Sequence, residues 1–185
     1  MTSNMNNALL FLVDTLLGLY IIAVMLRFIL QAARADFFNP IAQFLVRVTD
    51  PVLQPLRYVI PRWGVYDMAA VVLMLVLAFV NIEAVLFLIG MHAKIGSVIV
   101  WSVFKLLVLA CNLYFFSILV QAILSWFSPG MHSQASVILW DLNEPLLRPV
   151  RQVLPPIGGL DFSPLVVLIA LQVINMLIPL PGLFR

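Results

Sequence analysis

The chain has 185 residues, of which 64% are apolar and only 10% are charged. A soluble domain of this size could not show so few charges to water, and the net charge of +2 is too small for a nucleic-acid binder. The composition therefore excludes a soluble enzyme domain, a disordered chain and a nucleic-acid-binding protein, and it predicts an integral membrane protein.

Four apolar stretches follow one another along the chain, and each predicts a membrane-spanning helix. They cover about residues 8–30, 68–91, 97–127 and 163–183. The third is longer than one span requires, and the fourth is the shortest because Pro179 and Pro181 interrupt its end. No cation precedes the first stretch, so we expect it to be retained rather than removed as a signal peptide. The predicted fold is an all-α membrane protein with four transmembrane helices.

The cationic residues between these stretches are unevenly distributed. Six arginines lie in the two long connections, whereas the opposite side carries only Lys94 and Arg185. Cytoplasmic loops of membrane proteins are enriched in Lys and Arg. We therefore expect both long connections in the cytoplasm and both termini outside it.

The two halves of the chain predict a tandem repeat. A shift of 94 residues superposes segment 51–67 on segment 145–161 with eight identities, and it places the first two apolar stretches on the last two. Repeats with two spans each are parallel. We expect residues 1–94 and 95–185 to form two such halves, each with the order helix, cytoplasmic loop, helix, packed as a pseudo-symmetric four-helix bundle.

Each long connection has two parts. The first is expected to be a short amphipathic helix, because Ile41, Phe44, Leu45 and Val48 recur at helical spacing. The second is the repeated pattern P-x3-P-x-R-x3-P, followed by Asp. Because its prolines are four residues apart, the pattern predicts a helix-broken segment at the membrane interface. Its residues are Pro51, Pro55, Arg57, Pro61 and Asp67 in the first repeat, and Pro145, Pro149, Arg151, Pro155 and Asp161 in the second.

Two interpretations of the repeated arginine and aspartate stay open. In the structural one, the arginine holds the proline segment in place and the aspartate begins the next helix. In the functional one, the four side chains form a site at the pseudo-twofold axis for lipid headgroups or for a protein partner.

The same residues carry a family resemblance. The segment Gln31–Pro40, with Thr49-Asp50-Pro51 and Pro55-Leu56-Arg57, resembles the first repeat of the YggT (YlmG-related) bacterial membrane proteins, and the segment Pro145–Pro164 resembles the second. The resemblance covers nearly the whole chain and implies a bacterial inner-membrane protein without agreed catalytic residues. With the loop charges, this predicts periplasmic termini. Members of the family are connected with osmotic-shock tolerance and ion uptake. YlmG-type relatives are connected with cell division, and a plastid relative with assembly of a b-type cytochrome.

Ionisable groups inside predicted spans are functional candidates because they are costly to bury in lipid. Glu83 and Lys105 are expected at a similar depth, about 12 Å below the outer surface, and to pair across neighbouring helices beside an outward-facing cavity. Asp14 is expected nearby. In the alternative interpretation, Asp14 and Lys105 simply extend to the interface.

A second polar group is predicted at the inner side of the membrane. Arg27 and Gln31 lie four residues apart on one helical face, and Gln121 is the repeat equivalent of Arg27. These side chains are expected to form a polar seam where the repeats meet, or else Arg27 extends to the cytoplasmic headgroups.

Two functions stay open, and neither is enzymatic. The sequence has no phosphate-binding loop, nucleophile elbow or metal-ligand spacing, so we expect no catalytic residue, cofactor or metal. The first function is an envelope scaffold or assembly factor, in cell division or membrane-complex assembly, whose loops hold anionic lipid headgroups, membrane-protein partners or a second copy. The alternative is an ion-conducting or osmotic-stress-response protein with Asp14, Glu83 and Lys105 on the path.

Overall fold

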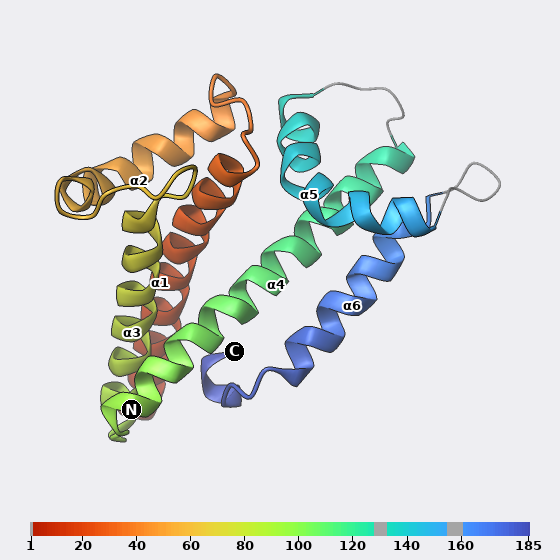
Figure 1. Cartoon of the computed structure of the whole chain (residues 1–185). Helices are drawn as coiled ribbons and strands as arrows, with labels where there is room; N and C mark the ends of the chain where they lie inside the picture. Colours follow the sequence, from red (N-terminus) through yellow and green to blue (C-terminus); the bar gives the residue numbers. More distant parts are fainter. Residues whose placement is uncertain (1, 128–132, 155–160) are drawn as a thin grey trace.

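A computed structural model describes residues 2–127, 133–154 and 161–185, and these ranges contain helices but no strands (Figure 1). The described helices are α1 (Thr2–Ala32), α2 (Pro40–Val59), α3 (Met68–Ile89), α4 (Ile95–Phe127), α5 (Gln134–Val153), α6 (Ser163–Leu177) and the short 3-10 helix η1 (Gly182–Phe184). The all-helical prediction is therefore confirmed.

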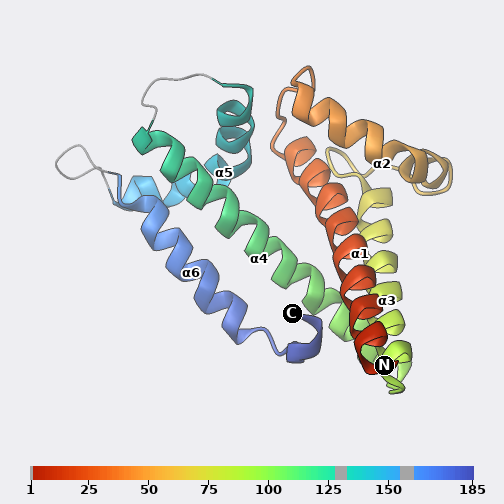
Figure 2. The same ribbon diagram turned by 180° about the vertical axis from the view of Figure 1, so that it is seen from behind.

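The helices form two pairs with two further helices lying across one end. Helix α1 packs on α3, α4 packs on α6, and α4 also contacts α3 (Figure 1). The view from behind shows α2 and α5 at the same end of these pairs, with both chain termini toward the other end (Figure 2). The two long connections thus lie at one end of the molecule and the termini toward the other.

Three helices are long and apolar enough to cross a membrane: Asn4–Ala32, Met68–Ile89 and Ile95–Ser125. Helix α6 is apolar but has only 15 residues, a length of about 22 Å. The prediction that this helix continues to residue 183 is wrong, because Pro179 cannot continue the helical hydrogen bonding. The chain instead folds back, and Leu180 and Phe184 are buried against α3 and α4.

The prediction of helix-broken proline segments is also wrong. Helix α2 continues through Pro51 and Pro55, and α5 continues through Pro145 and Pro149. A proline has a helical φ angle, so a helix can absorb the missing donor and the ring clash by bending. Prolines four residues apart lie on the same side, so their bends add. Figure 1 shows both helices bent along their length.

Both cross-lying helices are amphipathic, and their bounds differ by 94 residues, the offset of the sequence repeat. Helix α2 buries Ala42, Leu45, Thr49 and Leu53, whereas Phe44, which belongs to the predicted apolar face, is 64% exposed. Helix α5 buries Ile138, Leu142, Asn143 and Leu147. The predicted amphipathic helices are thus present, but each includes the proline motif and is 20 residues long.

Two polar caps meet where the halves join. The Asn39 carboxamide oxygen caps α2 by accepting from Ile41 N–H at 2.9 Å, and its Nδ2 donates to the carbonyl of Gln134 at 2.8 Å. Ser133, the repeat equivalent of Asn39, caps α5. An apolar cluster that includes Leu30, Ala42 and Leu142 packs beneath this contact.

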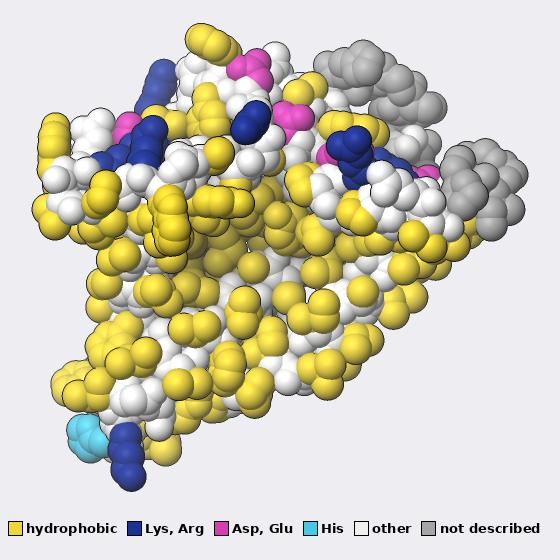
Figure 3. Space-filling view, viewed as in Figure 1, with side chains coloured by type: hydrophobic (Ala, Val, Ile, Leu, Met, Phe, Trp, Pro, Cys, Tyr) yellow, Lys and Arg dark blue, Asp and Glu magenta, His cyan; other side chains and the backbone are white. Residues whose placement is uncertain are grey.

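The surface follows the same division. In the space-filling view, charged side chains gather over the α2 and α5 end, while the surface of the helix pairs is largely hydrophobic (Figure 3). This distribution is typical of a membrane protein, whose lipid-facing surface is apolar.

Candidate functional site

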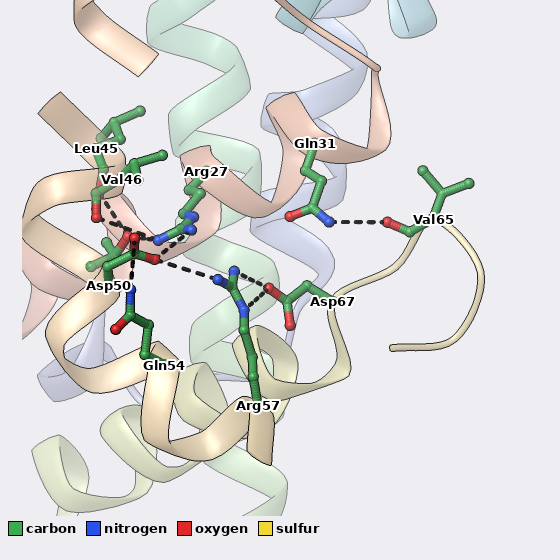
Figure 4. Close-up of polar contacts among 10 residues, drawn as sticks. Arg27, Gln31, Leu45, Val46, Asp50, Gln54, Arg57, Val65 and Asp67 are labelled. Carbon is green, nitrogen blue, oxygen red and sulfur yellow. Dashed lines mark hydrogen bonds and ion pairs between the residues drawn. The ribbon is translucent and has the colours of Figure 1, made fainter. Parts of the chain in front are cut away.

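The repeated arginine and aspartate of the first half form an ion pair. Nε of Arg57 donates to Oδ2 of Asp67 at 2.9 Å, and Nη2 of Arg57 donates to the same oxygen (Figure 4). Asp67 is only 1% exposed and occupies the N-cap position of α3, yet its side chain makes no capping hydrogen bond there. The carboxylate therefore connects the end of α2 to the start of α3.

The second half repeats this connection between α5 and α6. Nε of Arg151 donates to Oδ2 of Asp161 at 2.8 Å. The guanidinium also lies over the Trp140 ring, 5.1 Å from its centre, in a cation–π contact. Burial alone would raise the pKa of the Asp161 carboxyl, but hydrogen bonds from Ser163 and Arg151 lower it below the ordinary value.

Each repeated arginine has a second acidic partner, seven residues before it. Nη1 of Arg57 lies 3.4 Å from Oδ1 of Asp50, and Nη1 of Arg151 lies 2.6 Å from Oε2 of Glu144. The two acids are repeat equivalents. The arginine therefore bridges two acids in each half. Asp67 lies at the start of α3, as the structural interpretation expects, but its carboxylate pairs with Arg57 and does not cap the helix.

Arg27 joins the same network from α1. Its Nη1 donates to the Thr49 hydroxyl at 2.6 Å and its Nη2 lies 2.7 Å from Asp50 (Figure 4). The Thr49 hydroxyl in turn donates to the carbonyl of Leu45 at 2.6 Å. Arg27 is 6% exposed, so it fastens α1 to α2 through buried charge.

The equivalent contact in the second half is uncharged. Nδ2 of Asn143 donates to Oε1 of Gln121 at 2.7 Å, and the Ser117 hydroxyl donates to Oδ1 of Asn143 at 2.6 Å. The predicted polar seam between the repeats is not formed by Arg27 and Gln121, because each reaches the cross-lying helix of its own half. Gln31 makes only a long contact, 3.5 Å from its Nε2 to the Val65 carbonyl.

The motif prolines do not take part in this network. Pro51, Pro55, Pro145 and Pro149 are all exposed, and at helical spacing Pro51 and Pro55 lie on the side of α2 away from Arg57. Pro61 is exposed in the connection after α2, and Pro155 lies outside the described residues. The prolines thus shape the bends while the arginines and acids fix the position of the helices.

A separate polar cluster lies among α1, α3 and α4. Nζ of Lys105 donates to Oδ1 of Asp14 at 2.7 Å and to Oδ1 of Asn81 at 2.6 Å. Lys105 is 4% exposed and Asn81 is fully buried, whereas the Asp14 side chain is 45% exposed. The expected nearness of Asp14 and Lys105 is confirmed.

The predicted Glu83–Lys105 pair is wrong. In the described residues the ion-pair partner of Lys105 is Asp14, and the α3 residue that binds it is Asn81. Residues two positions apart on a helix point in directions about 160° apart. A helix α3 that turns Asn81 toward Lys105 therefore turns Glu83 away from it.

The repeat equivalent of Asn81 is Asn175 on α6, and it too accepts from a cation. Nη1 of Arg185 donates to Oδ1 of Asn175 at 3.3 Å, and Nδ2 of Asn175 donates to Oδ1 of Asn112 at 2.7 Å. Position 18 of the first half, which corresponds to Asn112, holds a glycine, and Nδ2 of the buried Asn81 has no hydrogen-bond partner among the described residues. The two halves thus share an asparagine that binds a cation but differ in its second contact.

Several residues of these networks were missed by the motif search: Thr49, Asp50, Asn81, Asn143 and Glu144. Asp50 and Glu144 could have been found, because they are acids at equivalent positions directly before the proline motif. Thr49 and Asn143 share polarity but not identity, which a search for identical residues does not detect. Within the described ranges, no group of three His, Cys, Asp or Glu side chains could hold a metal ion.

Comparison with known proteins identifies the relatives of this architecture. A protein of Vibrio alginolyticus is 42% identical over 174 residues, which cover 92% of this chain and 93% of that protein. The uncharacterized protein YggT of Escherichia coli K12 is 41% identical over 172 residues, covering 92% of this chain and 88% of YggT. An uncharacterized protein of Pseudomonas aeruginosa is 40% identical over 176 residues, covering 94% and 89%. No solved structure matches the chain.

The names of these relatives include no enzymatic activity, and nothing in them points to catalysis. The family model named CCB3/YggT matches residues 6–89 and 100–181, one stretch in each half. The chain therefore belongs to the CCB3/YggT family.

Proposed function

We propose that this protein is a non-enzymatic scaffold or assembly factor of the bacterial inner membrane, with a role in cell division or in the assembly of membrane complexes. Its two halves, residues 1–94 and 95–185, are tandem parallel repeats. Four spans, α1, α3, α4 and α6, cross the bilayer, with α2 and α5 on its cytoplasmic face and both termini in the periplasm. Helices α2 and α5 support this architecture, because both are 20 residues long, both continue through two prolines, and their bounds differ by 94 residues.

One observation carries the proposal: an ion-paired arginine at the equivalent position of each half fastens the surface helix of that half. Arg57 bridges Asp50 and Asp67, and Arg151 bridges Glu144 and Asp161. Two helices held rigidly across one end of the spans make a platform at the membrane surface. Such a platform suits the binding of partner proteins, because little conformational entropy is lost when a rigid surface binds.

The platform presents exposed side chains at equivalent places on its two helices. Tyr58 and Val59 near the end of α2 are 91% and 81% exposed, and Val153 at the end of α5 is 80% exposed. Partner membrane proteins, or a second copy of this chain, would contact these positions.

Photo-crosslinking in intact cells tests the proposal. A photoreactive residue at Tyr58 or Val153 is expected to give discrete protein adducts of the same mass, whereas Phe87, 79% exposed near the other end of α3, is the control. Adducts that vanish when Arg57 and Arg151 are replaced by Gln, while the membrane level of the protein is kept, support a platform. Lipid adducts alone at Tyr58 and Val153 would overturn it.

The proposed sides of the membrane are tested separately by thiol labelling. Cys111 is the single cysteine, so a Cys111→Ser chain carries no background thiol. Cysteines at Tyr58 and Val153 are expected to react with an impermeant reagent only after the inner membrane is opened, and a cysteine at Met91 in intact spheroplasts. The opposite pattern would reverse the proposed topology.

Ion conduction is the second candidate, and the Asp14–Asn81–Lys105 cluster favours it. Ionisable residues inside spans often mark ion or proton pathways. Purified protein in liposomes would then pass ions under an osmotic gradient, and Lys105→Met would abolish the flux. Absence of flux from the wild-type protein would remove this candidate.

A further inference from the structure

An apolar groove lies between the bent α2 and the first turns of α3. Its volume is about 490 Å3, and all of its lining residues are apolar: Pro51, Val52, Pro55, Leu56, Val72, Leu73 and Val76. The ion pairs of Arg57 belong to the other side of α2. No polar side chain therefore competes for a ligand inside the groove.

The groove continues into an apolar track along α3. Val72, Val76 and Val80 recur every four residues and so lie along one side of the helix. Val76 is 52% exposed and Val80 is 46% exposed, so this side of α3 faces outward. The track leads from the surface helix along the span, in the direction that a lipid acyl chain follows.

A positive charge without an ion-pair partner among the described residues lies on α2 one helical turn before the groove. Arg47 is exposed, has no ion pair among the described residues, and lies one helical turn before Pro51. Arg27 and Arg57, by contrast, are neutralised by Asp50 and Asp67. The position equivalent to Arg47 in the second half is Asp141, so this charge is specific to the first half.

Aromatic side chains mark the level of the membrane surface beside the groove. Tyr58, Trp63 and Tyr66 are 91%, 77% and 56% exposed, and they lie at the end of α2 and in its connection to α3. Tyrosine and tryptophan are enriched at the headgroup level of membrane proteins. Because the groove lies between α2 and α3, we infer that it opens close to this level.

We propose that the α2–α3 groove binds an anionic phospholipid, with one acyl chain along Val72, Val76 and Val80 and the phosphate on Arg47. A guanidinium binds a phosphate through two parallel hydrogen bonds, and the net negative headgroup neutralises the arginine. The inference rests on the part of the proposed function that places α2 at the membrane surface. It does not depend on a protein partner.

Native mass spectrometry of the full-length protein tests the site. The purified protein in detergent is mixed with phosphatidylglycerol or with phosphatidylcholine of the same acyl chains. The wild type is expected to prefer phosphatidylglycerol, and Arg47→Gln to lower the affinity for it about fivefold while leaving phosphatidylcholine unchanged. Val72→Trp, which fills the groove, is expected to lower the affinity for both lipids by about tenfold or more.

The repeat supplies a matched control. Val166 is the equivalent of Val72 on α6, so Val166→Trp makes the same change in the other half and is expected to leave lipid binding as in the wild type. Equal binding of the two lipids by the wild type, or full phosphatidylglycerol binding by a folded Val72→Trp variant, overturns the proposal. If either of these results occurs and the photo-crosslinking experiment still gives protein adducts at Tyr58, the lipid site is excluded and the proposed scaffold function is retained.

Discussion

Arg57 and Asp67, ten residues apart, connect the end of one helix to the start of the next, and Arg151 and Asp161 make the same connection 94 residues later. The two pairs differ chiefly in burial. The Asp67 side chain is 1% exposed and the Asp161 side chain is 36% exposed. One motif thus provides a buried and an exposed example of the same contact within a single chain.

This difference in burial predicts unequal effects of the same substitution. Asp67→Asn leaves the Arg57 guanidinium half-paired in a buried place, so we expect a loss of about 2–4 kcal/mol in the free energy of unfolding. Asp161→Asn removes an exposed pair and is expected to lose about 1 kcal/mol or less. Denaturant unfolding in detergent, with Asp141→Asn as control, measures both. Equal losses at the two aspartates would contradict the role of burial.

The Asp161 carboxyl also predicts a pH dependence. Its pKa is lowered in the folded protein from an ordinary value of 3.8, so the folded state favours the ionised form. Its contribution to stability is therefore present above that value and is lost as the pH falls through the lower, folded pKa. The stability difference between the wild type and Asp161→Asn should shrink toward zero on acidification below about pH 4. A difference that stays constant down to pH 2 would argue against this pair.

The intramembrane cluster predicts coupling between Asp14 and Lys105. Asp14→Leu leaves the buried Lys105 ammonium without its counter-charge and is expected to destabilise by about 3–5 kcal/mol. The double variant Asp14→Leu with Lys105→Met should lose less than the sum of the single losses, with a coupling energy of about 1–3 kcal/mol. Additive losses would show that the two side chains do not interact. Glu83→Gln is the control and should stay within about 0.5 kcal/mol of the wild type.

The unpartnered amide of Asn81 predicts a stabilising substitution. A Cβ atom built on Gly18 meets no atom within 4 Å, so there is room for a larger side chain. Gly18→Asn would supply the acceptor that Asn112 gives Asn175, and we expect a gain of about 1 kcal/mol in unfolding free energy. The reciprocal Asn112→Gly should destabilise the second half by about 1–2 kcal/mol. Loss of stability with Gly18→Asn would show that the two positions are not equivalent.

Periodicity and the repeat made much of this fold predictable from sequence. The first three apolar stretches and the amphipathic segment after Pro40 form helices at the expected places. Helices α2 and α5 begin 94 residues apart, which is the offset of the sequence repeat. These features are local or depend on comparing the chain with itself. The pairing of the repeated arginine with the repeated aspartate was not predicted, although both residues border the connection between two helices.

The errors concern choices that local sequence does not determine. Whether Pro51 and Pro55 break a helix or bend it depends on the contacts that hold the helix on each side of them, here the pairs of Arg27 and Arg57. Whether Lys105 binds Glu83 or Asn81 depends on the rotation of α3 about its own axis. That rotation is set by packing among three helices, and no single helix encodes it.

The hydrogen bond between Asn39 and Gln134 connects the beginnings of the two surface helices. Because one buried side chain caps α2 and also holds the first residue of α5, the beginnings of both helices form a common hinge point. Replacing Asn39 by Ala would therefore remove the cap of α2 and a contact with the first residue of α5 at the same time.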